Sequence, residues 1–165
     1  MRQPPDEEFK DVIDPDVDLG DPAQAAETRL RQWDILAGIA AGGVLGAEAR
    51  YGLAEAIPRA HGAFPWATLF TNVLGCLLIG VLMVWVLEVL PPTRLVRPFL
   101  GVGILGGFTT FSTFGVDVVH LVDEHRAGLA LLYVLASVVL CLAAVLLALV
   151  VGRRLFIRDA EKAAL

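Results

Sequence analysis

The amino-acid sequence predicts an all-α membrane protein with four transmembrane helices, of which the third is broken. Of the 165 residues, 56% are hydrophobic and only 19% are charged, and the mean hydropathy is +0.68. A soluble domain of this size needs a larger share of polar residues to cover its surface. Each crossing of a bilayer takes about 20 mostly apolar residues. Three stretches of about this length contain no charged residue, namely 62–87, 98–116 and 127–152.

Residues 1–30 differ from the rest of the chain in charge and composition. Nine of the eighteen acidic residues precede residue 28, against two basic residues, which gives this part a net charge of −7. It holds four prolines and few apolar residues, so it cannot bury enough surface to fold alone. It also lacks the basic start and apolar run of a signal peptide. We expect an acidic disordered tail over 1–30, a four-span domain over 31–158 and a short polar tail over 159–165.

The four expected spans differ in how clearly the sequence marks them. The first carries three charged residues, Asp34, Glu48 and Arg50, in an otherwise apolar stretch. The second ends at Pro91-Pro92, because proline has no N–H to donate within a helix. The spans are expected near residues 33–53, 66–90, 97–121 and 128–152.

Four spans place both ends of the chain on one side of the membrane. That side holds eight basic residues near the spans, whereas the other side holds Arg59 and Arg126, with Arg50 close to it. The excess predicts cytoplasmic termini in a multi-pass protein of the cell (inner) membrane. The eight basic residues are Arg29, Arg31, Arg94, Arg97, Arg153, Arg154, Arg158 and Lys162.

The third span contains a stretch that is a poor helix former in the middle of a bilayer. Gly106-Gly107 precedes Phe108-Thr109-Thr110, and both glycine and β-branched threonine disfavour a helix interior. A break here would free backbone carbonyls, which the membrane tolerates only where protein, ion or water satisfies them. One interpretation is an ion site made of carbonyl oxygens. The other is close helix packing through small residues, and the spacing leaves both open.

Three more side chains in the spans are candidates for contact with an anion. Phe111 and Phe114 lie three residues apart, hence on one helical face, and the edge of a phenyl ring is electropositive. The alternative is that both rings face lipid or core. Asn72 offers amide donors to a small anion, or else it makes an interhelical hydrogen bond.

Charged residues near the ends of the spans allow two interpretations each. Arg50 is a functional candidate because charge within the membrane is costly, but near a helix end it can also extend to the interface. Five residues at and just beyond the end of the third span resemble a metal-ligand cluster, although we expect a solvated helix end there. They are Asp117, His120, Asp123, Glu124 and His125.

Three segments taken together, 43–51, 68–75 and 106–114, resemble the Fluc fluoride channels, also called CrcB proteins. The resemblance covers roughly residues 35–155, with the motifs in the right order and on three different spans. It implies a fluoride-selective channel that exports fluoride passively across the membrane and lowers its cytoplasmic concentration and toxicity. It implies neither an enzyme nor a nucleic-acid partner. The sequence agrees in lacking nucleotide-binding and hydrolase motifs.

The resemblance further implies an antiparallel, dual-topology dimer with two fluoride pores and a central sodium ion that is structural and is not transported. By position in the motif, Gly106 and Thr109 would supply backbone carbonyls to this sodium. An antiparallel homodimer requires the same chain to insert in both orientations, whereas the eight-to-two excess of basic residues favours one. Dual insertion and pairing with an oppositely oriented homologous subunit therefore both stay open.

The same resemblance assigns the residues of the pore. Phe111 and Phe114 match a pair of phenylalanines whose ring edges meet fluoride, and Asn72 matches the pore asparagine. Thr113 matches a hydroxyl of the polar track, and Arg50 matches the arginine of the first span. Fluoride is small and strongly hydrated, so a pore has to replace its water with such donors without trapping the ion.

The match is weaker in the fourth span and at the end of the third. Tyr133 and Ser137 lie four residues apart and so on one helical face, where they correspond to that span's pore-lining pair. Gly115 stands where the family often has serine, and Asp117 where it usually has glutamate. The shorter acid leaves its role at the pore entrance open.

One competing function is a small proton-coupled multidrug-type transporter subunit. Such a transporter needs a carboxylate deep in the membrane to exchange protons. Glu48 is the only acidic residue that lies within a predicted span and away from its edge, and it comes late in the first span. A scaffold subunit without transport activity is the other alternative, which the polar residues of the pore type argue against.

Overall fold

The computed structural model describes the backbone of residues 22–85 and 95–163 and the side chains of residues 33–85 and 95–154. Every element in these ranges is a helix. The chain forms α1 (Pro22–Ala56), α2 (Trp66–Val84), η3 (Arg97–Leu105), α3 (Gly106–Phe108), α4 (Ser112–Asp123) and α5 (Ala127–Ala163). The start of the predicted acidic tail and the Pro91-Pro92 end of the second span lie outside the described residues.

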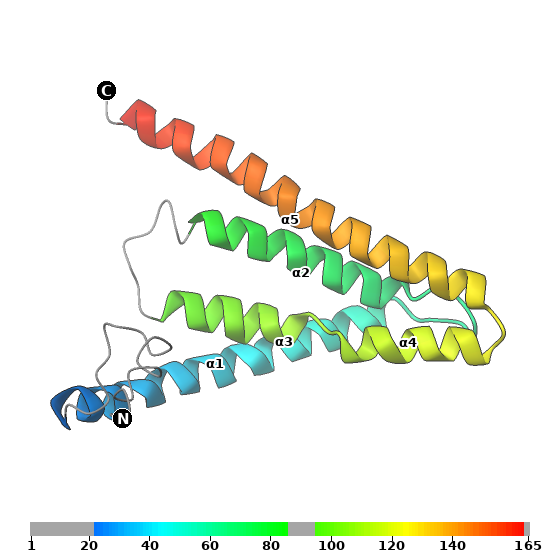
Figure 1. The fold of residues 1–165 in the computed structure, drawn as a ribbon, viewed down its shortest axis with the longest axis horizontal. Coiled ribbons are helices and arrows are strands. Elements are labelled where there is room, and N and C mark those ends of the chain that lie inside the picture. The colour runs from blue at the N-terminus through cyan, green and yellow to red at the C-terminus, as the bar shows by residue number, and fades with distance from the viewer. Residues whose placement is uncertain (1–21, 86–94, 164–165) are drawn as a thin grey trace, which may run out of the picture.

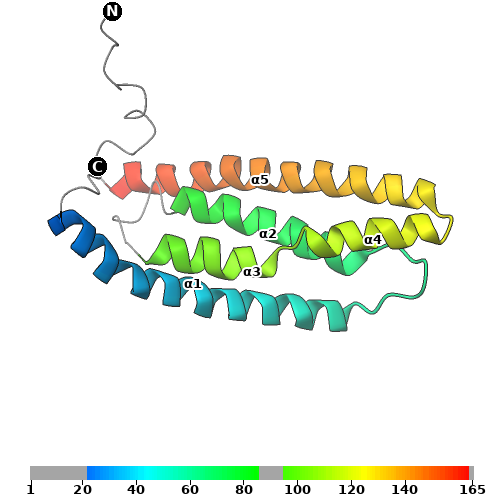
Figure 2. The ribbon, with the colours of Figure 1, turned by 60° about the horizontal axis from the view of Figure 1, so that its bottom comes forward.

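The chain reverses direction from α1 to α2, from α2 to the third-span segments, and from α4 to α5, which gives an elongated bundle (Figure 1). The π-helical segment η3 continues into α3, and α4 follows α3 nearly end to end after a short unwound segment. Figure 2 shows α2 and the third-span segments between α5 on one side and α1 on the other. α1 begins and α5 ends at the same end of the bundle.

Three helical stretches within the described residues are long and apolar enough to cross a membrane, namely Trp66–Val84, Arg97–Asp123 and Ala127–Arg154. They confirm three of the four predicted spans by length and composition. α1 is a helix of 35 residues, but it carries Glu48, Arg50 and several glycines, which lower its hydropathy. It begins at Pro22, among good helix formers, so the predicted boundary of the acidic tail at residue 30 falls inside a helix.

α1 packs against η3 and α3 through glycines that bring the two backbones into contact. A Cβ added at Gly46 would collide with the carbonyl oxygen of Ile104, and one added at Gly107 would collide with that of Gly43. Gly42 and Gly103 are close to the facing backbone in the same way. Small residues allow this approach between membrane helices. The packing interpretation of the Gly106-Gly107 stretch is therefore right for Gly107.

The end of the bundle away from the chain termini holds a cluster of buried side chains from α2, α4 and α5. Its members are Leu69, Leu121, Ala130 and Tyr133. Closer to the chain ends, α2 and α5 approach through Gly80, where an added Cβ would lie 2.6 Å from the Cβ of Ala148. Many other large apolar side chains on the outer faces of the helices are exposed. Lipid or a second subunit has to cover these surfaces.

We predict that the substitution Gly46→Ala destabilises the protein by about 1–3 kcal/mol, because the new methyl group forces α1 away from the third span. Thermal unfolding in detergent measures the effect. Gly38→Ala is the matched control, since a Cβ at Gly38 has no neighbouring atom within 4 Å. It should leave stability unchanged or raise it by up to about 1 kcal/mol through its higher helix propensity. Equal melting temperatures for the two variants would contradict direct backbone packing.

Candidate functional site

The third span is broken at the predicted place. Thr109 is extended, with φ −74° and ψ 158°, and α4 begins only at Ser112. Figure 1 shows the unwound segment between α3 and α4. The prediction of a broken third helix is thus confirmed.

Asn72 on α2 holds the break in place through hydrogen bonds to both the carbonyl oxygen and the N–H of Thr110. Its Nδ2 donates to the Thr110 carbonyl oxygen at 2.9 Å, and its Oδ1 accepts from the Thr110 N–H at 2.9 Å. The interpretation of Asn72 as an interhelical hydrogen-bonding residue is therefore right. An amide nitrogen carries two hydrogens, and the bond to Thr110 uses one of them.

These bonds change the partners of two backbone carbonyls. In a continuous α-helix the Thr110 N–H would donate to Gly106 and the Thr113 N–H would donate to Thr109. Here the first donates to Asn72, and the second donates to the Thr110 Oγ1 at 3.1 Å. The carbonyls of Gly106 and Thr109 therefore lose their regular helical donors. Oxygen ligands of this kind suit a hard cation.

An open groove of about 600 Å³ runs along α2, the broken span and α5. Six of the predicted site residues line it, namely Asn72, Gly106, Thr109, Phe111, Phe114 and Ser137. We call this space the first groove. Gly106, unlike Gly107, is not packed against α1, because the nearest atom to an added Cβ is 3.8 Å away. The two neighbouring glycines therefore serve different surfaces.

Two kinds of side chain in the first groove could meet an anion. The rings of Phe111 and Phe114 are 5.7 Å apart between centroids, and Phe111 is 83% exposed. The Oγ of Ser137 is buried and has no hydrogen-bond partner within the described part of the chain. A buried hydroxyl without a partner is costly, so a hydrogen-bond partner for this atom would be stabilising.

Tyr133, predicted to line the pore beside Ser137, lies behind the groove. Its side chain is fully buried and its ring is 5.1 Å from that of Phe114 between centroids. It therefore supports Phe114, while Ser137, one turn further along α5, reaches the groove.

Arg50 and Thr113 lie in a different hollow, the second groove, of about 230 Å³ between α1, α2 and α4. Thr68, Thr71 and Thr110 line it as well. The Thr110 Oγ1 donates to the Thr113 Oγ1 at 3.1 Å. Thr110 lines both grooves and so connects the predicted polar track to the break. Sequence reasoning missed the role of Thr110, although its place after Thr109 in the broken stretch was a usable signal.

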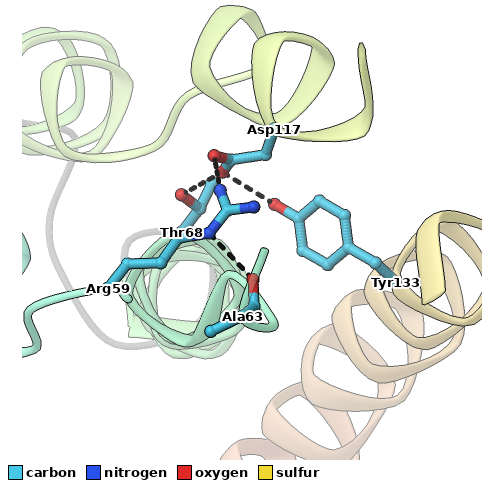
Figure 3. A network of polar contacts seen from close by, with 5 residues as sticks. All are labelled: Arg59, Ala63, Thr68, Asp117 and Tyr133. Atoms are coloured by element: carbon cyan, nitrogen blue, oxygen red, sulfur yellow. Dashed lines mark hydrogen bonds and ion pairs between the residues drawn. The ribbon is translucent and has the colours of Figure 1, made fainter. Parts of the chain in front are cut away.

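A network of polar contacts closes the end of the bundle away from the chain termini (Figure 3). The Asp117 carboxylate pairs with the Arg59 Nη1 at 2.5 Å and accepts a hydrogen bond from the Thr68 Oγ1 at 2.7 Å. The Tyr133 hydroxyl lies 3.5 Å from the same carboxylate. The Arg59 Nε donates to the Ala63 carbonyl oxygen at 2.8 Å.

The interpretation of Asp117 as part of a solvated helix end is wrong, because its exposure is only 8%. It points into the bundle, where Arg59 satisfies its charge. The interpretation is right for the four residues that follow it in the candidate cluster, which are exposed. They are His120, Asp123, Glu124 and His125. The contact between Arg59 and Asp117, 58 residues apart in sequence, gave no local signal.

Comparison with known proteins agrees with this geometry. The family model described as CrcB-like protein, Camphor Resistance (CrcB), matches residues 37–149. The chain is 45% identical over 126 residues to the fluoride-specific ion channel FluC 2 of Streptomyces avermitilis, covering 76% of this chain and 80% of that protein. It is 50% identical over 113 residues to FluC 2 of Thermobifida fusca, covering 68% and 84%.

The similarity covers almost the whole length of a third relative. The fluoride-specific ion channel FluC of Magnetococcus marinus is 44% identical over 119 residues, which are 72% of this chain and 97% of that protein. The matched region of the family model contains the break, both grooves and the network at Asp117. The chain therefore belongs to the CrcB-like protein family.

Proposed function

We propose that the protein is a fluoride-selective ion channel subunit that lets fluoride leave the cell passively, which lowers its cytoplasmic concentration and toxicity. The observation that carries this proposal is the first groove, where the rings of Phe111 and Phe114 and an unpaired Ser137 hydroxyl lie beside a broken membrane helix. Relatives at 44–50% identity named fluoride-specific ion channels support it.

The lining of the first groove suits a small, strongly hydrated anion. Ser137 and Asn72 can donate hydrogen bonds, and Phe111 and Phe114 can present electropositive ring edges. Neither lysine nor arginine is among the residues that line this groove. A fixed positive charge could trap fluoride, and conduction requires binding weak enough for the ion to leave.

The second groove supplies the approach to this path. Its threonine hydroxyls, including that of Thr113, offer further donors, and Arg50 places a positive charge near them. A charge at an entrance raises the local concentration of the oppositely charged ion without sitting in its path.

The channel requires a second subunit, because the first groove is open along one side. Lipid cannot satisfy the amide of Asn72, the Ser137 hydroxyl or the carbonyls of the break. Counting α1, the chain has four spans and both of its ends lie on one side of the membrane. A partner inserted in the opposite orientation can then cover the groove. That partner is a second copy or an oppositely oriented homologous subunit.

The freed carbonyls of Gly106 and Thr109 fit a structural sodium ion. Both residues line the open groove and both have lost their regular helical donors. A bound sodium ion would neutralise the partial negative charge of these oxygens where two subunits meet. Its role is to stabilise the assembly, and it is not transported.

A proton-coupled transporter has weaker support. The first groove is lined by no acidic residue, and the buried Asp117 carboxylate is held by Arg59. Fluoride efflux from liposomes that contain only this protein separates the two functions. A channel dissipates a fluoride gradient in the absence of a proton gradient, whereas efflux that needs a proton gradient would contradict the proposal.

In this assay we predict that Phe111→Ile or Phe114→Ile lowers fluoride efflux roughly tenfold or more, since isoleucine keeps apolar volume but lacks an electropositive edge. Phe70→Ile is the matched control, because Phe70 is exposed on α2 and stacks on Trp66 outside the groove. It should leave efflux unchanged. Normal efflux from well-folded groove variants would remove the two phenylalanines from the pore.

We predict that sodium stabilises the purified protein relative to the large organic cation N-methylglucamine. A ligand at a hundred times its Kd adds about 2.7 kcal/mol to stability, which thermal unfolding detects. Asn72→Ala should lose the effect, because the freed Thr110 N–H can return to the Gly106 carbonyl. Equal unfolding of the wild type in both cations, or full efflux with sodium rigorously excluded, would refute the sodium site.

The orientation of the chain is testable with single cysteines placed at His61, in the loop between α1 and α2, and near the C-terminus. The native Cys76 and Cys141 are first replaced by serine. Dual insertion predicts that a membrane-impermeant thiol reagent labels both positions from both sides in cells expressing this chain alone. If the C-terminal position is labelled only from the cytoplasm, the homodimer is excluded and a homologous partner is required.

A further inference from the structure

Asp117 places a negative charge close to both grooves. Thr68, which donates to the carboxylate at 2.7 Å, lines the second groove. Tyr133, whose hydroxyl lies 3.5 Å from it, stacks near Phe114 of the first groove. Tyr133 thus contacts Phe114 with its ring and directs its hydroxyl toward the carboxylate, as Figure 3 shows for the hydroxyl. Charges in such low-dielectric surroundings interact far more strongly than in water.

Arg59 supplies the opposite charge from outside the spans. It belongs to the loop that joins α1 and α2, and its side chain folds over the end of the bundle to reach α4. Two contacts fix the guanidinium, one from Nε to the Ala63 carbonyl oxygen at 2.8 Å and one from Nη1 to Asp117 at 2.5 Å. It lines neither groove.

We propose that Arg59 is a residue on which conduction depends: it cancels the charge of Asp117 and so removes an electrostatic barrier to fluoride at this end of the path. The inference rests on the proposed function. Arg59 acts through Asp117 and does not touch the ion. An alternative role is purely structural, in which the ion pair only ties the loop to α4, and the two roles differ in what happens when both charges are removed.

The test compares fluoride efflux from liposomes for a set of variants. Arg59→Gln leaves the Asp117 charge unopposed, so efflux should fall about tenfold or more. Arg59→Lys keeps the charge and should stay within about threefold of the wild type, although lysine loses the forked geometry. Asp117→Asn should conduct at least as fast as the wild type. The double variant R59Q/D117N should recover most of the efflux that Arg59→Gln loses.

The matched control removes a second arginine from the same end of the bundle. Arg126 donates from Nη1 to the Gly62 carbonyl oxygen at 3.0 Å, a neutral partner in the same loop. Arg126→Gln should therefore change efflux by less than about twofold if the charge of Asp117 is what matters. Melting temperatures of all variants in detergent report separately on folding.

The double variant decides the outcome even if Arg59→Gln fails to fold, because it buries no unpaired charge. Efflux within about threefold of the wild type supports charge cancellation. A folded double variant that conducts no faster than a tenth of the wild type overturns it and leaves a structural role. Unchanged efflux in a folded Arg59→Gln protein overturns it as well. Absence of efflux from the wild type overturns the proposed function and this inference with it.

Discussion

The bilayer allows a backbone to unwind only where its polar groups find other partners, and the bond pair between Asn72 and Thr110 meets that condition here. The amide takes over both the N–H and the carbonyl of Thr110, so the break costs no lost hydrogen bond at this residue. It withdraws the Thr110 N–H from the Gly106 carbonyl, and the Thr110 Oγ1 takes the Thr113 N–H that would otherwise reach the Thr109 carbonyl. The candidate site follows from this exchange, in which the Asn72 side chain replaces the helical hydrogen-bond partners of Thr110.

The two faces of the third span are divided between packing and exposure. Gly103 and Gly107 let the backbone of η3 and α3 touch that of α1, which holds the broken span rigidly on one side. Gly106 lies on the face of the third span that is turned away from α1, where its backbone borders the open groove. A break that was not clamped in this manner could refold into a continuous helix or collapse against a neighbour.

Charged side chains are kept out of the first groove. The Asp117 carboxylate, the only acidic side chain buried within the described residues, is compensated by Arg59, Thr68 and the neighbouring Tyr133. The groove itself is lined by uncharged groups. This separation suits a path for an anion, since donors without formal charge can replace hydration and still release the ion.

The sequence by itself determined the helical class, three apolar spans, the place of the break and six of the residues that line the first groove. Those features depend on composition, helix propensity and short motifs, which are local properties of the chain. Only the tertiary structure decided that Tyr133 supports the groove from behind, that Thr110 connects the two grooves and that Asp117 is buried against Arg59. These depend on contacts between residues far apart in sequence, and no local pattern encodes which loop cation folds back onto which helix.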